Sequence, residues 1–430
     1  MQKSTMHTIS VQKNWDVIII GGGIIGLSTA WALARQGLQV ALFEKGTVGA
    51  EQSSRNWGWI RSLRRDLAEL PMALRVNETW SKLQEQVNVG YRKTGLAYFA
   101  SSEQEMASHE KWLAAARQIG VKGELLGRAA AEDLVGGTKQ PLAGALYSAE
   151  DGVAEPQMVP GIVAKLAAFA GVKIVENCAV RGLDVAGGKV VGVWTEQGRF
   201  GAAAVVCAGG IWSRLFCGNF GINLPQLKVA ATAFETTPIG NGPQVALNGG
   251  EYTCRPHCSG GYVISKLNAS IVEIVPDSFK LFWKFFPAWR AESKLLKLRF
   301  GKKFFEELAV PTKFSMEQVS PFEKNRVYDA IPTERTISQA MDSVRLAFPQ
   351  FAQTKIARQW GGLIDVTPDA LPIISGVGST PGLFIATGFS GHGFGIGFAA
   401  GDMMAGIIFD KSNRNRREED AFSFDRFDLG

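Results

Sequence analysis

The sequence predicts an α/β protein that combines a parallel sheet with a second, antiparallel sheet. The first observation is the stretch Asp16–Lys45, in which an apolar run, a glycine-rich turn, an alanine-rich helix and a second apolar run follow one another. The second is the alternation of apolar and polar residues at positions 227–345, which indicates strands. The third is the length of 430 residues, which exceeds the usual size of one domain. We therefore expect two domains.

The stretch Asp16–Lys45 has the order of a βαβ unit. Val17–Ile20 and Val40–Phe43 are the two predicted strands, and the helix between them ends near Gly37. This order predicts that both strands are buried and parallel, with the helix packed on one face of their sheet.

Four residues of this unit form the fingerprint of a dinucleotide site. Gly21 permits the tight turn, Gly23 lets the backbone approach a pyrophosphate, and Gly26 lets the helix pack against the strand, so that the helix N-terminus faces the diphosphate. Glu44 ends the second strand, about where an acid accepts hydrogen bonds from an adenosine ribose. Glycines alone are a weak signal, but strands, helix and acid agree here. They predict a Rossmann-like domain rather than a turn without a ligand.

The next elements lead into the second domain. A loop at 49–66 holds hydroxyls, an arginine and two tryptophans, which suit phosphates and an aromatic ring better than a solvated surface. Apolar residues then recur at helical spacing at 72–87. Tyr91–Ala100 alternates like a strand, and Glu103–Ile119 has the pattern of a helix with a polar face.

The middle of the chain returns to the dinucleotide-binding pattern. Val159–Phe169 is a predicted helix, a hairpin follows through Gly187-Gly188, and Ala203–Cys207 is a buried strand that runs into small residues. The remaining predicted elements are strands at 172–175, 179–185, 356–362 and 382–387 and a helix at about 395–409. Residues 14–90, 151–226 and 350–410 are thus assigned to the dinucleotide-binding domain, 91–150 and 227–349 to a substrate-binding domain, 279–305 to a basic, apolar insertion and 411–430 to a charged tail.

Composition and charge exclude several kinds of protein. The hydrophobic fraction of 46% and the charged fraction of 20% are ordinary for a globular enzyme. The net charge of +6 is modest and the basic residues are interleaved with acids, so we expect no nucleic-acid partner. Cys254, His257 and Cys258 have no second pair of ligands nearby in sequence, and none of the five cysteines forms a CxxC pair, so we expect no metal site. The first thirteen residues contain no apolar run of the kind that a secretory signal needs, which predicts a cytoplasmic protein.

Three segments together resemble a known family. They are the glycine fingerprint, the Ala-Gly-Gly-Ile-Trp-Ser sequence at 208–213 and the Thr-Gly-Phe-Ser-Gly-His-Gly-Phe-Gly sequence at 387–395. Over nearly the whole chain the sequence is similar to the flavoprotein superfamily of D-amino-acid oxidase, glycine oxidase and sarcosine oxidase. Residues 177–216 and the closing Phe424–Phe427 resemble bacterial membrane-associated L-amino-acid deaminases.

The resemblance implies FAD as the cofactor. Glu44 and Lys45 would hold the AMP half, residues 52–54 would meet the pyrophosphate and flavin, and Val180 would contact adenine through its backbone. The loop at 391–395 would lie under the pyrimidine edge of the flavin, where its N–H groups stabilise negative charge on the reduced ring. The full set that the resemblance assigns to FAD is Gly21, Gly22, Gly23, Ile25, Gly26, Glu44, Lys45, Gln52, Ser53, Ser54, Val180, Ala208, Gly209, Gly388, Gly391, His392, Gly393, Phe394 and Gly395.

The chain departs from these relatives in two places near the expected substrate. It has Gly391-His392-Gly393, as in the wider superfamily, where the deaminases carry a tryptophan-containing loop. It also has Gly362-Leu363-Ile364-Asp365 where D-amino-acid and glycine oxidases have Gly-Leu-Arg-Pro, so their usual carboxylate anchor is absent. Arg61 and Arg255 are the two candidate anchors, ahead of Lys266, because an arginine binds a carboxylate bidentately. The alternative for each is an ordinary ion pair.

The resemblance implies an enzyme that oxidises the Cα–N bond of an amino acid to an imine, which water hydrolyses to a 2-oxo acid and ammonia. The protein must hold the substrate over the ring, remove an amine proton and fix the carboxylate. His392 is the candidate for the amine proton, and the alternative is a packing or hydrogen-bonding role. One rival function is a secondary-amine dehydrogenase acting on an imino acid, opine or N-methyl amino acid. Another is a non-catalytic flavin-binding subunit of an amine-oxidising complex.

The insertion at 279–305 suggests a membrane surface. Aromatic and apolar residues alternate there with eight basic residues and one acid, as in a helix that lies in an anionic membrane. Pro287 is expected to break it into two helices, neither long enough to span a bilayer. The alternative is a solvated helical pair with its aromatics in the core. Membrane contact would place the protein peripherally at the inner face of the cytoplasmic membrane and favour a quinone over oxygen as electron acceptor. The amino acid, its enantiomer, the acceptor and the oligomeric state stay open.

Overall fold

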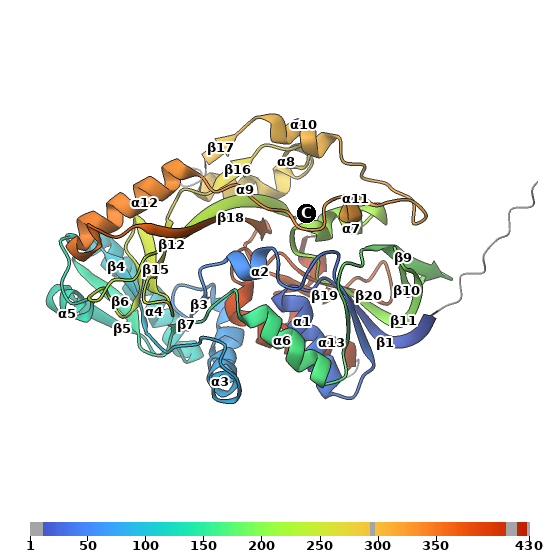
Figure 1. Cartoon of the computed structure of the whole chain (residues 1–430), viewed down its shortest axis with the longest axis horizontal. Helices are drawn as coiled ribbons and strands as arrows, with labels where there is room; N and C mark the ends of the chain where they lie inside the picture. Colours follow the sequence, from blue (N-terminus) through green and yellow to red (C-terminus); the bar gives the residue numbers. More distant parts are fainter. Residues whose placement is uncertain (1–11, 293–296, 410–418, 428–430) are drawn as a thin grey trace, which may run out of the picture.

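The computed structural model describes residues 12–292, 297–409 and 419–427. Two large sheets dominate it, with strands β1, β9, β10 and β11 toward one end of the molecule and β4, β5 and β6 toward the other (Figure 1). The mixed α/β class predicted from the sequence is confirmed.

The first sheet has eight strands and is built on the βαβ unit. Its order is β19-β20-β11-β1-β2-β8, and β10 and β9 extend it from β11 as an antiparallel hairpin. The strands β8, β2, β1, β11 and β20 run parallel to one another, and β19 is antiparallel to β20. The bounds are β1 Gln12–Ile20, β2 Val40–Phe43, β8 Lys173–Val175, β9 Val180–Ala186, β10 Lys189–Thr195, β11 Gly198–Cys207, β19 Ile373–Gly376 and β20 Leu383–Thr387.

Helices cover this sheet closely. Helix α1 (Ile24–Arg35) packs against α13 (Gly393–Phe409) and α6 (Val159–Phe169), and α3 (Leu70–Gln86) packs against α13. A Cβ atom on Gly401 would lie 2.5 Å from the carbonyl carbon of Ser28, so the backbones of α13 and α1 touch. The glycine at this position therefore sets the distance between the two helices.

The second sheet has ten strands, most of them antiparallel. Its order is β17-β16-β12-β15-β14-β13-β4-β6-β5, and β18 pairs with the other side of β12. The pairs β4–β13 and β16–β17 are parallel. The bounds are β4 Leu96–Ala100, β5 Glu124–Gly127, β6 Gly144–Ser148, β12 Leu227–Thr236, β13 Ala246–Asn248, β14 Tyr252–Pro256, β15 Tyr262–Lys266, β16 Ile271–Glu273, β17 Lys297–Arg299 and β18 Ile356–Val366. Helices α4 (Glu103–Ile119), α5 (Arg128–Leu134) and α12 (Glu334–Ala347) pack on it.

Strand β18 differs from the expected domain assignment. The sequence grouped residues 350–410 with the dinucleotide-binding domain, but β18 pairs with β12 from Leu227 to Thr236 and so belongs to the second sheet. Its last residues then lead back to β19 and β20 of the first sheet. The two sheets are thus joined through β18, and the site described below lies along it.

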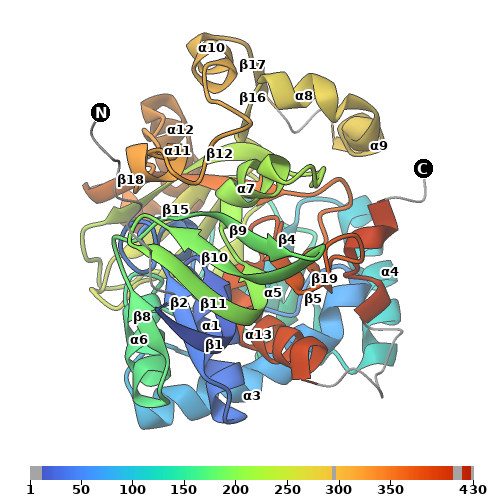
Figure 2. The same ribbon diagram turned by 90° about the vertical axis from the view of Figure 1, so that its right-hand side faces the viewer.

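The segment between β16 and α11 (Pro321–Lys324) contributes β17 to the second sheet, and its helices lie outside both sheets. Its helices α8 (Pro276–Lys280), α9 (Phe282–Glu292) and α10 (Lys302–Leu308) rise above the rest of the molecule (Figure 2). The expected helix break at Pro287 is wrong, because Pro287 lies inside α9 and the break is at Leu281. An exposed helix can leave the carbonyl that loses its N–H partner to water. Among the described residues, no helix is both long and apolar enough to cross a bilayer.

The expected C-terminal tail is only partly described. Residues 411–418 and 428–430 lie outside the described part of the chain. Phe422 is fully buried, its carbonyl accepts a hydrogen bond from Ile374 N, and Phe424 N donates to Ser375 Oγ. Residues 421–427 are therefore packed against β19 rather than forming a free tail.

Candidate functional site

A cavity of about 390 Å3 runs along the carboxyl ends of the parallel strands. At one end it is lined by Ile20, Glu44 and Ala208, which follow or end β1, β2 and β11. At the other end it is lined by Arg61, by Ile364 of β18 and by the loop before α13. The carboxyl edge of a parallel sheet is where α/β proteins bind ligands.

The glycine turn closes tightly at the first end of the cavity. Gly21 has φ +108° and a Cβ there would lie 2.5 Å from Ala208 O, so only glycine fits between β1 and β11. A Cβ on Gly26 would lie 2.0 Å from Gly21 O, which explains why the helix packs directly on the turn. Ile24 N, in the first turn of α1, donates to Ser53 Oγ at 2.8 Å. The helix N-terminus carries no acidic residue and faces the cavity, which suits a diphosphate.

Glu44 is held by backbone donors on both sides. Its Oε2 accepts from Gly22 N at 2.6 Å and its Oε1 accepts from Gly46 N at 2.8 Å. Burial raises the pKa of this carboxyl above its ordinary value, although the two N–H groups oppose that shift. The remaining lone pairs face the cavity and can accept hydroxyl donors such as those of a ribose. Together with the glycine turn, Glu44 therefore fits the adenosine half of FAD.

Most residues that the sequence assigned to FAD lie along this cavity. Four lie outside its lining: Gly22 donates to Glu44, Gly26 packs on Gly21, Ser54 Oγ lies 3.3 Å from Glu51 O, and Gly388 N donates to Asp365. The residues that line it are Gly21, Gly23, Ile25, Glu44, Lys45, Gln52, Ser53, Val180, Ala208, Gly209, Gly391, His392, Gly393, Phe394 and Gly395.

Lys45 is occupied by contacts that the sequence did not suggest. Its ammonium pairs with Glu51 at 2.8 Å and lies 4.5 Å from the ring centroid of Trp212. It also donates to the two carbonyls that follow α11, those of Asn325 and Arg326. The lysine therefore joins the end of β2 to the segment after α11.

Asp365 is a buried hub that sequence reasoning missed. It is 3% exposed and accepts hydrogen bonds from the side chains of Gln52 and Gln226 and from Gly388 N, at 2.7, 3.0 and 2.7 Å. Burial raises the pKa of its carboxyl, and these donors oppose the shift. The signal was present in the Gly-Leu-Ile-Asp sequence, where an acid replaces the proline of relatives.

The loop before α13 meets a buried charge cluster. His392 Nδ1 lies 2.9 Å from Glu69 Oε2, and Arg65 Nη1 donates to the same oxygen at 3.3 Å. Glu69 is fully buried and Arg65 is 3% exposed. Burial raises the pKa of Glu69, but His392 and Arg65 outweigh it and bring the pKa to about 2. Burial also lowers the pKa of His392, so its imidazole is neutral at neutral pH.

Arg61 is the described cation along the cavity that no carboxylate neutralises. Lys45, Arg55 and Arg65 pair with Glu51, Asp329 and Glu69, whereas Arg61 donates to the carbonyl of Leu63. Its loop is fixed because Asp151 accepts from Ser62 N and Leu63 N at 2.8 and 3.1 Å. The guanidinium therefore keeps donors available in the cavity.

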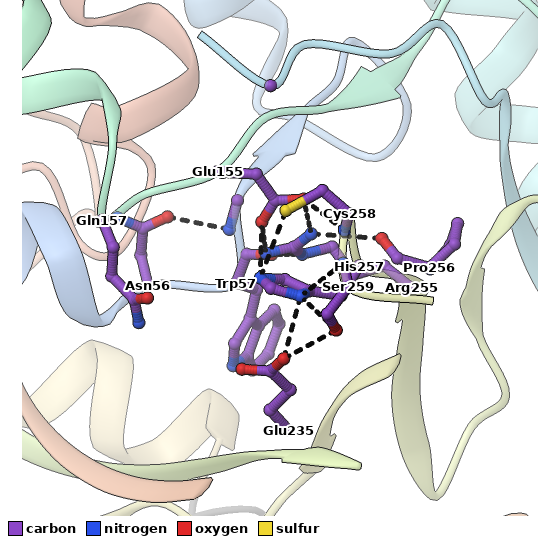
Figure 3. Close-up of polar contacts among 12 residues, drawn as sticks. Asn56, Trp57, Glu155, Gln157, Glu235, Arg255, Pro256, His257, Cys258 and Ser259 are labelled. Carbon is purple, nitrogen blue, oxygen red and sulfur yellow. Dashed lines mark hydrogen bonds and ion pairs between the residues drawn. The ribbon is translucent and has the colours of Figure 1, made fainter. Parts of the chain in front are cut away.

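Arg255, the other candidate anchor, points elsewhere. It is 2% exposed, its guanidinium donates to both oxygens of Glu155 and to Trp57 O, and it does not line the cavity (Figure 3). Because these contacts occupy the donors, Arg255 supports the cavity wall at Trp57 and has no free face for a substrate. Lys266 pairs with Glu251. The partner Glu155 lies 100 residues away from Arg255 in sequence, which is why sequence reasoning missed it.

Cys254 lies apart from His257 and Cys258, the other two residues of this segment that could bind a metal. Cys254 is 1% exposed on β14. Among the described residues, the group with metal-ligand atoms close together is Glu155, His257 and Cys258, within 4.8 Å of one another. Its carboxylate is already bonded to Arg92 and Arg255, and His257 Nδ1 faces Glu235 at 2.9 Å (Figure 3). These ion pairs account for the cluster.

Comparison with known proteins agrees with this geometry. Residues 16–407 match the model of a family described as DAO, FAD dependent oxidoreductase. The L-amino acid deaminase of Proteus myxofaciens, solved in complex with anthranilate, is 31% identical with a TM-score of 0.92, over 97% of this chain and 94% of that chain. The sarcosine oxidase subunit beta of Rhodobacter capsulatus is 26% identical over 92% of this chain and 86% of its own length. The glycine oxidase of Geobacillus kaustophilus is 31% identical over 50% of this chain and 59% of its own length.

Proposed function

We propose, from the premise that this chain belongs to the DAO family of FAD-dependent oxidoreductases, that it oxidises the Cα–N bond of an amino acid to an imine. Water then hydrolyses the imine to a 2-oxo acid and ammonia. The enzyme is an FAD-dependent amino-acid or amine oxidoreductase, and the proposal concerns its substrate and the residues that serve it.

The observation that carries the proposal is the unneutralised guanidinium of Arg61. An α-amino acid brings a carboxylate, and a buried carboxylate without a cation costs several kcal/mol. The other cations along the cavity are already paired within the protein. Arg61 therefore supplies the charge that the substrate carboxylate needs, in place of the arginine that Ile364 replaces.

The wall around Arg61 suits an apolar side chain. Trp57 and Trp59 line the cavity with their rings 5.4 Å apart, and Leu363 and Ile364 line it from β18. Burial of an apolar or aromatic substrate side chain against these residues is favourable by about 25 cal/mol per Å2 of apolar surface. We therefore favour an amino acid with such a side chain over an acidic or basic one.

The cofactor and the protein share the work of the reaction. Bound FAD supplies the hydride acceptor. The residues proposed to hold it are those listed above along the cavity, with Glu44 at the ribose and the 391–395 backbone at the flavin. His392 is proposed to accept the amine proton, because its ring is neutral, lies in the cavity wall and is fixed at Nδ1 by Glu69.

A secondary amine is the second candidate substrate. Its support is the sequence similarity to sarcosine oxidase subunit beta over 92% of this chain and the position of Arg61 in the loop after Gln52. A secondary amine carries the same carboxylate, so Arg61 serves both. Because that relative is one subunit of its enzyme, a non-catalytic flavin-binding role is a third candidate.

Anaerobic flavin reduction separates these candidates. The purified protein is mixed with D- and L-amino acids and their N-methyl analogues while flavin absorbance is followed. We expect bleaching by primary amino acids of one enantiomer, with one 2-oxo acid and one ammonia released per flavin reduced. Bleaching by N-methyl amino acids alone would establish the second candidate. No bleaching with any substrate would overturn the enzymatic proposal.

The α8–α10 segment supports a peripheral position at an anionic membrane surface. Trp283 is 80% exposed, and Phe279, Phe300 and Phe305 are 66, 60 and 61% exposed. The aromatics lie in the same segment as Lys280 and Lys302, which pair with Asp277 and Glu306 but whose side chains are 56 and 94% exposed. Exposed aromatics and lysines are the combination that such a surface binds. We propose that this segment docks the enzyme where quinone is dissolved, so that quinone rather than oxygen takes the electrons.

A further inference from the structure

We propose that Glu69 is the positioning residue for His392: it holds the imidazole with Nδ1 protonated, so that the Nε2 lone pair is the one that receives the substrate's amine proton. The inference rests on the proposed function, in which His392 takes that proton. It adds a residue 323 positions away in the sequence, which does not line the cavity.

The geometry of the pair carries the inference. Glu69 Oε2 lies 2.9 Å and Oε1 3.2 Å from His392 Nδ1. A carboxylate can only accept at these distances, so Nδ1 must be the protonated nitrogen. Among the described residues, no hydrogen bond or ion pair is formed by Nε2, and His392 lines the cavity. The lone pair of the neutral ring is therefore on Nε2, which leaves it available to accept a proton from a molecule in the cavity.

The rest of the cluster keeps this carboxylate ionised and in place. Arg65 donates to Glu69 Oε2, to Arg61 O at 2.7 Å and to His392 O at 3.5 Å. A Cβ on Gly395 would lie 2.9 Å from Arg65 Nη2, so the absence of a side chain on α13 leaves room for the guanidinium. Trp80 Nε1 donates to Gly395 O at 3.0 Å and fixes the same turn from α3. The charged groups that face His392 from all packed elements are thus Glu69, Arg65 and Arg61.

The step itself is a proton transfer and needs no further reactant. The N–H bond of the substrate ammonium breaks, its electron pair stays on nitrogen, and the proton forms a bond to His392 Nε2. The imidazolium that results lies between Glu69 and the substrate, where the carboxylate stabilises the new charge. A purely structural role would need only the ion pair of Glu69 with Arg65, and it makes no prediction about the protonation of His392.

The test combines Glu69→Gln, Glu69→Asp, His392→Asn and the double variant Glu69→Gln/His392→Asn. Glutamine keeps the size but loses the charge, so we expect kcat to fall 10- to 100-fold with KM changed less than threefold. Because Glu69 raises the pKa of His392, its loss should also move the acid limb of kcat/KM to lower pH. Glu69→Asp should restore part of the activity. In the His392→Asn background, Glu69→Gln should change kcat no further.

A readout independent of turnover is the tautomer of His392. In protein labelled with 15N-histidine, the resonance that disappears in His392→Asn should show a protonated Nδ1 and an unprotonated Nε2, and this pattern should be lost in Glu69→Gln. Asp184→Asn is the matched control, because it removes another buried carboxylate paired with an arginine, Arg199, in the β9–β11 region away from the cluster. It should leave the tautomer and the pH profile unchanged.

The outcomes separate this inference from the proposed function. An active wild-type enzyme whose pH profile and His392 tautomer are unchanged by Glu69→Gln would overturn the inference alone. Equal and additive losses in the single and double variants would also overturn it, because Glu69 would then act independently of His392. A wild type that no amino acid or amine reduces would overturn both.

Discussion

Gln52 donates a 2.7 Å hydrogen bond from its side-chain nitrogen to Asp365 Oδ1, and this bond joins helix α2 (Gln52–Arg55) to strand β18. Asp365 Oδ2 also accepts from Gln226 and Gly388 N. One buried carboxylate therefore ties the loop after β2, the antiparallel sheet and the loop after β20 together at the cavity.

Replacement of Asp365 by alanine should destabilise the fold and loosen FAD. Gly388 N and the side-chain nitrogen of Gln52 would each lose their acceptor, at about 1–3 kcal/mol per group, whereas Gln226 would keep the carbonyl of Gly210. Urea unfolding should show the loss in the free energy of unfolding, and the FAD content of the purified protein should fall. Asp369→Ala is the control, since that carboxylate pairs with Arg426 at the surface, where such pairs contribute about 0–1 kcal/mol. Equal stability of the two variants would contradict the hub role of Asp365.

Binding of FAD should weaken as the pH falls. Burial raises the pKa of Glu44, so its carboxylate takes up a proton at a higher pH than an exposed glutamate does. The protonated form offers fewer lone pairs to the ribose, so FAD affinity is full above the raised pKa and is lost as pH falls through it. Quenching of tryptophan fluorescence on FAD addition to apoprotein measures this between pH 7.5 and 5. Glu44→Gln should bind at least tenfold more weakly at pH 7.5 and respond little to pH.

Two glycines of α13 should respond oppositely to alanine. Gly401→Ala places a Cβ 2.5 Å from the backbone of Ser28, which must separate α13 from α1 and cost about 1–3 kcal/mol. A Cβ on Gly406 meets nothing within 4 Å, so Gly406→Ala should stabilise the helix by about 0.5–1 kcal/mol. Thermal unfolding of the two holoproteins measures both. A lower unfolding temperature in Gly406→Ala would contradict this prediction, because it would mean that other atoms lie within contact distance of the added methyl group.

Local patterns explain which parts of the fold could be predicted from the sequence. The helices at Glu103–Ile119 and Val159–Phe169 have the bounds that their apolar spacing predicts, and the βαβ unit forms as expected. The pairing of β18 with β12 could not be predicted, because Ile356 and Thr236 are 120 positions apart and no local pattern selects a distant strand. The domain boundary near residue 350 was misplaced for that reason.

In the candidate site, too, contacts between segments far apart in the sequence could not be predicted. The glycine fingerprint and Glu44 lie in one short βαβ unit, whose local pattern fixes their relative positions, so the sequence could predict them. Glu69 with His392, and Glu155 with Arg255, are ion pairs between distant segments. A sequence shows that Arg61 and Arg255 are both arginines, and only packing shows that one has a carboxylate partner and the other does not.

Replacement of Arg61 should weaken substrate binding without loss of FAD. A hydrogen bond to a charged group contributes about 1.5–3 kcal/mol, so Arg61→Met should raise KM roughly 10- to 150-fold. Steady-state kinetics with the best amino acid, together with the flavin absorbance ratio, measure this. Arg64→Ala is the matched control, because Arg64 is exposed three positions away. An unchanged KM in Arg61→Met would rule out Arg61 as the carboxylate anchor. A substrate analogue with an amide in place of the carboxylate should bind the wild type more weakly by the same free energy that Arg61→Met loses.

The enzyme should bind anionic vesicles through α8–α10. Full burial of one large apolar side chain is worth about 1.5–3 kcal/mol, and each cation near an anionic surface adds about 1 kcal/mol. Trp283→Ser removes a side chain of α9 that is 80% exposed. It should therefore lower the binding constant for phosphatidylglycerol vesicles, measured by sedimentation, roughly 10- to 150-fold. Turnover of a soluble substrate should stay the same. Phe169→Ser is the control: Phe169 is 95% exposed on α6, at the opposite side of the molecule in Figure 1, and its loss should not change vesicle binding. High salt should release the wild type, because the lysines act through screened charge. A protein that stays in the supernatant at low salt, and that forms one hydrogen peroxide per imine, would be an oxidase without membrane contact.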